Sequence, residues 1–466
     1  MNDRYLLTLV LCLLCMAVRG ADLTADSVGF ARLHIETVGG EEPTCDFVFP
    51  PEGGFGISIT NATKVPGRMV MTLGGDTLYD SGEYEKGVSG MTIKIRGNTS
   101  VYWWNLRPYK LKLQKKADLL LRNDGVNHKD KNWVLLHEGF FTLHAMVGQM
   151  VSRLLDMPWT PSYRYVMVYL NGRYLGFYML CESVEQNVSA RVDVDKECGY
   201  IFERDAYWWN EDLWFADADG RQYTFKHPDP DEVLPAQVDY LKAQVDTMLE
   251  RIGEGRYADV IDCESFARWL LAHDILGSYD SGGANIYLTR HDTLPDTKMM
   301  MGPLWDFDSN FRCTTDFARI HTDPFFIYPK LTESSDNSFA RSYCELWSRY
   351  KDRLFSQIDS MLAAYPASAE GQALQRARTY DSIQRIYADT LPVVSVNIEE
   401  CRAWFRERKE VLQQLIEQRM APLGVERMPL APVGRPAAAG YTLQGTVAPR
   451  GYKGIVLKGG KKYVAR

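Results

Sequence analysis

The sequence predicts an α+β fold, with strands concentrated in the first half of the chain and helices in the second. Apolar residues alternate with polar or basic ones in "MTIKIRGNTS" (91–100) and in "RPYKLKLQKK" (107–116), which indicates two half-buried strands. Beyond about residue 232 the apolar spacing becomes helical, and residues 338–420 are helical by pattern almost throughout. Such segregation is typical of α+β proteins and is compatible with two lobes.

Two further stretches have clear local signals. "YRYVMVYLNGRYLGFYMLCE" (163–182) predicts a β-hairpin, because two β-rich runs are joined by Asn171-Gly172. "WVLLHEGFFTLHAMVGQMVSRLLDM" (133–157) predicts a strand followed by an amphipathic helix that ends before Pro158. We therefore expect one large domain over residues 21–428, with a β-rich lobe at about 21–230 and a helical lobe at about 231–428.

Composition excludes some classes of protein. The chain has 466 residues, of which 45% are hydrophobic, so it can bury a large core. Its 53 basic and 60 acidic residues are evenly mixed and give a net charge of −7. This balance argues against a protein that binds nucleic acid through a strong positive field, and we expect no nucleic-acid partner.

The two ends of the chain predict export. Arg4 precedes an apolar run and then small residues at Gly20 and Ala21, which is the pattern of a secretory signal peptide over residues 1–20. The run is short for a stable transmembrane anchor. We expect a periplasmic, cell-surface or secreted protein. Residues 429–440 read as a linker, and 441–466 as a small basic tail that loosely resembles sorting segments of exported Bacteroidetes proteins.

Acidic residues in apolar surroundings mark the candidate chemistry. In "LGSYDSGGANIYL" (276–288) Asp280 lies five positions before Asn285, and "GPLWDFDSNF" (302–311) contains Asp306 and Asp308. The first stretch reads as the end of a helix, a loop and a strand. "TKMMMGPLWDFD" (297–308) reads as a second strand able to pair with the first.

Pairing of those strands would bring Asp280, Asn285 and Asp306 together. Oxygen-bearing side chains in such a cluster suit Mg²⁺ or Mn²⁺. The spacing D-x-x-x-x-N is also that of the catalytic loop of protein kinases, in which a later D-F-x acid binds the metal. The spacing is a weak signal by itself. A turn residue at Asp280 and a solvated turn or calcium loop at Asp306 and Asp308 are the alternatives.

An ordered series of motifs resembles the spore-coat-protein-H (CotH) kinase family. The motifs are "IKIRGNTS…RPYKLKL", "KNWVLLHEG", "YRYVMVYLNGRYLGFYMLCESVEQ", "YIFERD", "FKHPD" and "YDSGGANIYL…MGPLWDFDSNF". They cover roughly residues 30–315. The resemblance implies an atypical protein-kinase-like fold with two lobes. It also implies transfer of the γ-phosphoryl group of ATP to Ser or Thr of secreted or surface proteins, with a divalent metal.

The same resemblance implies roles for the acidic residues. Asp280 would be the catalytic-loop acid and Asp306 a metal-binding acid. By analogy with kinases, Asn285 would be a second metal ligand, and Asp308 would assist.

Binding of the phosphates requires cations. Lys110 and Lys112 share one face of their strand and Arg96 ends the strand before it, so we expect one of them to bind the α- and β-phosphates. Glu182 is the candidate to pair with that lysine or to contact the nucleotide, with Glu185 as the fallback. The alternative is that the two lysines only form a solvated face.

One departure from the family pattern leaves a second function open. The helix after "WVLL" has His144-Ala145 where the resemblance leads us to expect Arg-Asn. A non-catalytic pseudokinase that acts as a surface binding or adhesion module is therefore the alternative to an exported kinase. A glycoside hydrolase that uses Asp306 and Glu182 is a third and weakly supported hypothesis, because acid pairs are common in a chain with 60 acidic residues.

Overall fold

The computed structural model describes residues 23–103, 106–137, 142–278, 285–311, 315, 318, 326–386, 394–420, 454–458 and 461–465. The chain divides into two compact units, Met1–Glu417 and Gln418–Arg466. In the second unit, strands β16 (Gly454–Lys458) and β17 (Lys461–Ala465) form an antiparallel pair.

The larger sheet of the first unit has eight strands in the order β1-β9-β10-β8-β7-β6-β4-β5. Strand β1 pairs in parallel with β9 and antiparallel with β4, so the sheet closes on itself. The strands are β1 (Ala31–Thr37), β4 (Val65–Leu73), β5 (Asp76–Asp80), β6 (Met91–Ile95), β7 (Tyr109–Ala117), β8 (Asp130–Leu136), β9 (Tyr163–Leu170) and β10 (Arg173–Glu182). A short separate hairpin pairs β2 (Asp46–Val48) with β3 (Ser58–Thr60).

The alternation read from the sequence decides which face of this sheet forms the core. Ile93, Leu111 and Trp133 are paired across β6, β7 and β8, and all three are fully buried. Because side chains alternate between the two faces of a strand, Lys94 and Lys110 lie on the opposite face. The outer face of β6 and β7 is therefore basic, while the inner face is apolar.

A five-stranded antiparallel sheet has the order β12-β13-β11-β14-β15. Its strands are β11 (Tyr200–Arg204), β12 (Trp214–Ala216), β13 (Gln222–His227), β14 (Ile286–Arg290) and β15 (Met299–Met301). Pairing of β14 with β15 confirms the predicted hairpin. Strands β14 and β15 lie beyond residue 231 in the sequence but share a sheet with β11–β13, so strands do not end where the helical pattern begins.

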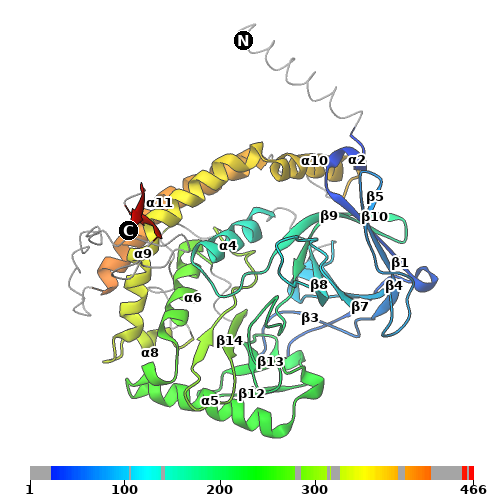
Figure 1. The fold of residues 1–466 in the computed structure, drawn as a ribbon. Helices are drawn as coiled ribbons and strands as arrows, with labels where there is room; N and C mark the ends of the chain where they lie inside the picture. Colours follow the sequence, from blue (N-terminus) through cyan, green and yellow to red (C-terminus); the bar gives the residue numbers. More distant parts are fainter. Residues whose placement is uncertain are drawn as a thin grey trace, which may run out of the picture. The chain divides into compact units, whose positions relative to one another are not determined.

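Helices precede, connect and follow these strands (Figure 1). The longer ones are α4 (Thr142–Leu154), α5 (Pro235–Gly253), α6 (Cys263–Leu276), α9 (Ser338–Ala364), α10 (Ala369–Ile383) and α11 (Val394–Met420), and the short ones are α2 (Ala25–Val28), α3 (Thr99–Trp103) and α8 (Tyr328–Thr332). The Arg402 guanidinium of α11 binds Asp359 of α9 at 2.8 Å, which holds these two helices side by side. Among the described residues, no helix has the length and apolarity needed to cross a membrane.

The local signals singled out in the sequence are confirmed. Strands β9 and β10 form a hairpin whose turn contains Asn171 and Gly172, both with positive φ. Helix α4 ends at Leu154, before Pro158. Helix α6 begins after Asp262, whose carboxylate accepts from the Ser265 amide, and ends at Gly277 in the left-handed conformation.

A buried carboxyl group joins α10 to the large sheet. The Tyr174 hydroxyl of β10 donates to Asp381 Oδ1 at 2.5 Å, and the Phe177 amide donates to Oδ2 at 3.4 Å. Burial raises the pKa of Asp381 to about 7. The carboxyl group therefore ties α10 to strand β10.

Asp381 should make stability fall as the pH rises towards neutrality. Its pKa is about 7 in the folded chain against an ordinary value of 3.8, so the folded chain keeps a proton that the unfolded chain releases. This contribution is complete below about pH 4 and is lost as the pH rises through about 7. We expect Asp381→Asn to flatten the fall in Tm between about pH 5 and pH 8.

The control for this measurement is Asp352→Asn, whose side chain is 80% exposed. It should leave the pH profile of the Tm unchanged. A profile for Asp381→Asn that is the same as that of the unmodified chain would contradict the assignment.

Candidate active site

The structure brings two of the predicted site residues into contact. Asn285 precedes β14, and Asp306 follows β15 by a few residues. The Asn285 carboxamide nitrogen donates to Asp306 Oδ2 at 3.3 Å. Both residues have positive φ, 62° and 61°, a conformation that Asn and Asp adopt more readily than most residues. The hairpin thus joins an amide and an acid that are 21 residues apart.

Asp280 lies outside the described residues, between Ser278 and Asn285. The residues that flank this stretch are both bonded to the segment containing Asp306. The Ser278 hydroxyl donates to the Asn310 carboxamide oxygen, and Asn285 donates to Asp306. Asp308 has an exposed side chain, and its backbone carbonyl accepts from His144 Nδ1 at 2.9 Å.

A buried ion pair is hydrogen-bonded to the backbone of Asn285. Glu203 of β11 accepts from the Asn285 backbone amide at 3.0 Å through Oε1, and its Oε2 lies 3.2 Å from Lys226 Nζ of β13. The side chain of Glu203 is 7% exposed and that of Lys226 is 29% exposed. The acid–amide contact and the ion pair therefore form one connected group.

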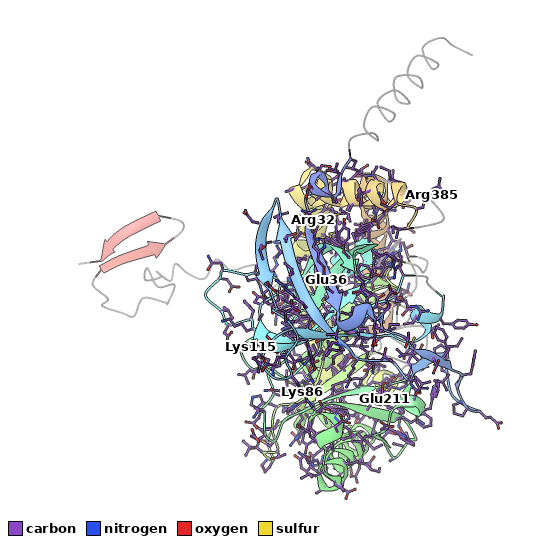
Figure 2. All side chains as sticks on the ribbon, turned by 90° about the vertical axis from the view of Figure 1, so that its right-hand side faces the viewer. Arg32, Glu36, Lys86, Lys115, Glu211 and Arg385 are labelled. Carbon is purple, nitrogen blue, oxygen red and sulfur yellow. The ribbon has the colours of Figure 1, made fainter. Side chains whose placement is uncertain are left out.

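The protonation of this ion pair is set by burial and by neighbouring charge. Burial raises the pKa of Glu203 to about 6, although Lys226 acts in the opposite direction. Burial lowers the pKa of Lys226, but the nearby carboxylates of Glu203, Asp205 and Glu211 outweigh it and raise the pKa above the ordinary value. Lys226 is therefore a permanent cation at neutral pH. Glu211 is labelled in Figure 2 near the strands of the five-stranded sheet.

Arg96 is the second cation near the acids. Its guanidinium carbon lies 5.9 Å from the ring centroid of Trp305, the residue immediately before Asp306. It also lies close enough to Tyr287 of β14 to lower the pKa of that hydroxyl, against the stronger effect of burial. The structure thus places Arg96 beside the segment that carries Asp306, and Lys226 beside Asn285.

Lysines on the outer face of β6 and β7 extend the positive charge. Lys94 and Lys110 are directly opposite each other across the two strands. Burial, together with Lys64 and Lys110, lowers the pKa of Lys94. Like charges in this arrangement destabilise a sheet, and Glu211 near Lys94 and Glu185 near Lys110 offset part of the repulsion. Lys112 lies on the same face and is exposed.

The expected pairing of Glu182 with a lysine is corrected by the structure. Glu182 is 1% exposed and accepts from Arg122 Nη2 at 2.7 Å and from the Ser162 amide at 2.9 Å. It is opposite Trp133, on the apolar face of the sheet. Lys110 points to the other face, and its partner is the fallback residue Glu185, at 3.6 Å.

Three charged residues near the site, Lys94, Glu203 and Lys226, were not predicted from the sequence, although the sequence contains signals for them. Glu203 and Lys226 lie in "YIFERD" and "FKHPD", two of the stretches that carry the family resemblance, but neither residue had been assigned a role. Each is a charged residue in an otherwise aromatic strand. A charge at such a position has to be paired when it is buried. Lys94 could have been found from the alternation in "TIKIR", which is the same signal that selected Lys110.

The oxygen atoms at the site fit a hard divalent cation. Asp306 and Asp308 contribute carboxylates and Asn285 a carboxamide oxygen, which are the ligand types that Mg²⁺ and Mn²⁺ prefer. In the part of the chain that the structure describes, no group of three or more His, Cys, Asp or Glu side chains is placed to hold a metal ion. Asn285, Asp306 and Asp308 are the described residues that would hold such a cation.

The site combines an acid and an amide that can hold a divalent cation with a lysine and an arginine nearby. Such a combination is suited to binding phosphate groups. Comparison with known proteins agrees with this class. A family model described as CotH kinase protein matches residues 93–423, which is more than half of the chain. The chain belongs to the CotH kinase family.

Comparisons with solved structures and with curated proteins do not extend this assignment. A solved structure described as a Helicobacter pylori proinflammatory kinase, CtkA, is 10% identical in sequence, with 63% of this chain and 94% of that chain covered. Its TM-score is 0.27, which is too low to establish a common fold. No curated protein matches the chain.

Substitutions in the Glu203–Lys226 pair should separate the contribution of Lys226 to stability from its contribution to phosphate binding. Lys226→Met would leave Glu203 buried without its cation, and we expect a loss of up to about 3 kcal/mol in the free energy of unfolding. The double variant Lys226→Met/Glu203→Gln removes that unpaired charge while keeping an oxygen for the Asn285 amide. It should recover most of the lost stability in urea denaturation.

Equal destabilisation in the single and double variants would contradict the pairing. The double variant should still lack any binding of phosphate groups that depends on Lys226. The comparison therefore separates the role of Lys226 in folding from its role at the site.

Proposed function

We propose that the chain is an exported protein kinase that transfers the γ-phosphoryl group of ATP to Ser or Thr of a secreted or surface protein, with Mg²⁺ or Mn²⁺. The observation that carries this proposal is the contact between Asn285 and Asp306 beside the Glu203–Lys226 pair. The family supports a kinase-like function. The acceptor, the metal and export are part of the proposal.

Each described residue would have a simple role. Asp306, with Asn285 and Asp308, would hold the divalent cation, which neutralises charge on the β- and γ-phosphates when it is bound. Lys226 and Arg96 would neutralise the remaining phosphate charge. Glu203 orients Lys226 and also fixes the Asn285 backbone through the 3.0 Å hydrogen bond.

Asp280 is the residue that would act on the acceptor hydroxyl. The resemblance to the family gives it the role of the catalytic-loop acid, which accepts the proton of the acceptor hydroxyl. Its neighbours Ser278 and Asn285 are both bonded to the segment 306–310. This anchoring supports the proposal that Asp280 and Asp306 serve the same site. A two-lobed arrangement, with nucleotide bound between the lobes, is the form of the fold that we propose.

A non-catalytic binding module remains the second candidate. It is favoured by one observation, namely His144-Ala145 at the position where the resemblance leads us to expect Arg-Asn. A chain of this kind would keep the fold and the nucleotide-facing cations but would not transfer phosphate. Binding of ATP without transfer is therefore the outcome that distinguishes the second candidate from the first.

A phosphoryl-transfer assay tests the proposal. Residues 21–466 should transfer labelled γ-phosphate from ATP to themselves or to a Ser/Thr-containing protein when Mg²⁺ or Mn²⁺ is present. Asp306→Asn should lower the rate about 100-fold or more, because it removes a charge that holds the metal. Asp193→Asn, with a side chain that is 62% exposed, is the matched control and should retain full activity.

The transfer assay is run together with a measurement of ATP binding. Transfer that is unchanged in Asp306→Asn would contradict the role of that residue. Transfer that is lost in Asp306→Asn supports the kinase. Metal-dependent ATP binding without transfer supports the binding module. Neither binding nor transfer with either metal would contradict both candidates.

A further inference from the structure

Helix α4 packs directly on the segment that carries Asp306 and Asp308. A Cβ atom added to Gly148 would lie 2.2 Å from the ring of Phe307, so the ring rests on the backbone of the helix. Phe307 is 4% exposed. Only a glycine allows this approach, and the position of the helix therefore determines where Phe307 and its acidic neighbours can lie.

Directional contacts join the first turns of α4 to the same segment. His144 Nδ1 lies 2.9 Å from the backbone carbonyl of Asp308. Since a carbonyl only accepts, the imidazole must carry its proton on Nδ1. In return, the Asn310 carboxamide donates to the His144 carbonyl at 3.3 Å. Asn310 itself is fully buried.

The hydrogen bonds that Gln149 of α4 makes to the large sheet are weak. Gln149 is 2% exposed, and its Nε2 reaches only two sulfur atoms, Met179 Sδ at 4.0 Å and Cys181 Sγ at 3.8 Å. Its Oε1 is buried and has no hydrogen-bond partner among the described residues. Sulfur is a poor acceptor, so Gln149 gives this part of the helix no strong hydrogen bond to the sheet. Buried apolar residues such as Val147 and Val151 pack the helix, and the bonds to Asp308 and Asn310 add directional contacts.

We infer that His144 is a positioning residue for the metal-binding acids. The inference rests on the proposed function, because it concerns the same site. The imidazole holds the Asp308 carbonyl, which lies directly after the exposed carboxylate of Asp308 and two residues after that of Asp306. His144 stands where the resemblance leads us to expect an arginine. The chain thus has a different donor at this position, and the departure from the family pattern does not imply an inactive site.

The physical need for such support is clear at Asp306. Its side chain is exposed and its backbone is in the left-handed region, with φ of 61°, so packing alone does not fix the carboxylate. Phosphoryl transfer depends on positioning, and a displacement of about 1 Å can reduce a rate about 100-fold. A hydrogen bond that fixes the backbone two residues away therefore affects catalysis without contact with substrate.

Two substitutions at the same position separate the hydrogen bond from packing. In His144→Asn the carboxamide nitrogen can occupy the place of Nδ1 and keep the donor, but the ring is lost. In His144→Phe the ring can keep its contact with Phe311, whose centroid is 5.3 Å away, but the donor is lost. We expect kcat to fall about 10- to 100-fold in His144→Phe and to change less than about 3-fold in His144→Asn. The KM for the acceptor should be unchanged in both.

A role in packing alone predicts the opposite order, with His144→Asn the more impaired variant. That order, or equal effects of the two substitutions, would overturn the inference. Thermal unfolding of both variants establishes that each is folded at the temperature of the assay.

Amide hydrogen exchange tests the inference without any enzymatic activity. The amides of Asn310 and Phe311 are bonded to the carbonyls of Phe307 and Leu276. In the nucleotide-free chain, their exchange should become faster in His144→Phe and stay near that of the unmodified chain in His144→Asn. Unchanged exchange over residues 304–311 in His144→Phe would overturn the inference. If the exchange result holds and no phosphoryl transfer is detected, the proposed function fails and the positioning role stands.

Discussion

The candidate site depends on one hydrogen bond, from the backbone amide of Asn285 to Glu203 at 3.0 Å. It links the start of β14 to the buried carboxylate of β11, and it holds Asn285 in the left-handed conformation in which its side chain meets Asp306. The same carboxylate binds Lys226. The proposed metal-binding pair and the proposed phosphate-binding cation are thereby positioned by one buried group, whose own burial requires that it remain paired.

That interaction depends on the packing of the two halves of the chain into one sheet. Strands β11 and β13 come from the β-rich part, and β14 and β15 come from the part where helices dominate. Helix α6 ends at Gly277, and Ser278 then bonds to Asn310, so both ends of the stretch containing Asp280 are anchored on one segment. Helix α4 also contacts that segment, with Phe307 against Gly148 and His144 against Asp308.

The sequence was sufficient wherever a local pattern determines the structure. Asn171-Gly172 predicts its hairpin, and the two apolar runs on either side of Leu294 predict the β14–β15 pair that joins Asn285 to Asp306. Glu182 could not be placed in this way. Strand β10 is buried on both faces over most of its length, so no alternation shows which way Glu182 points. The Glu203–Lys226 pair depends on the register of β11 and β13, which shifts between Ile201 and Phe202 and leaves no trace in local periodicity.

The most direct test of a shared metal–nucleotide site is a crystal structure of residues 21–466 with Mn²⁺ and a non-hydrolysable ATP analogue. The account predicts Mn²⁺ bound by Asp306 and by the carboxamide oxygen of Asn285, with the phosphates within hydrogen-bonding distance of Lys226 or Arg96. Nucleotide and metal bound elsewhere on the chain, with no ligand from Asp306 or Asn285, would contradict it.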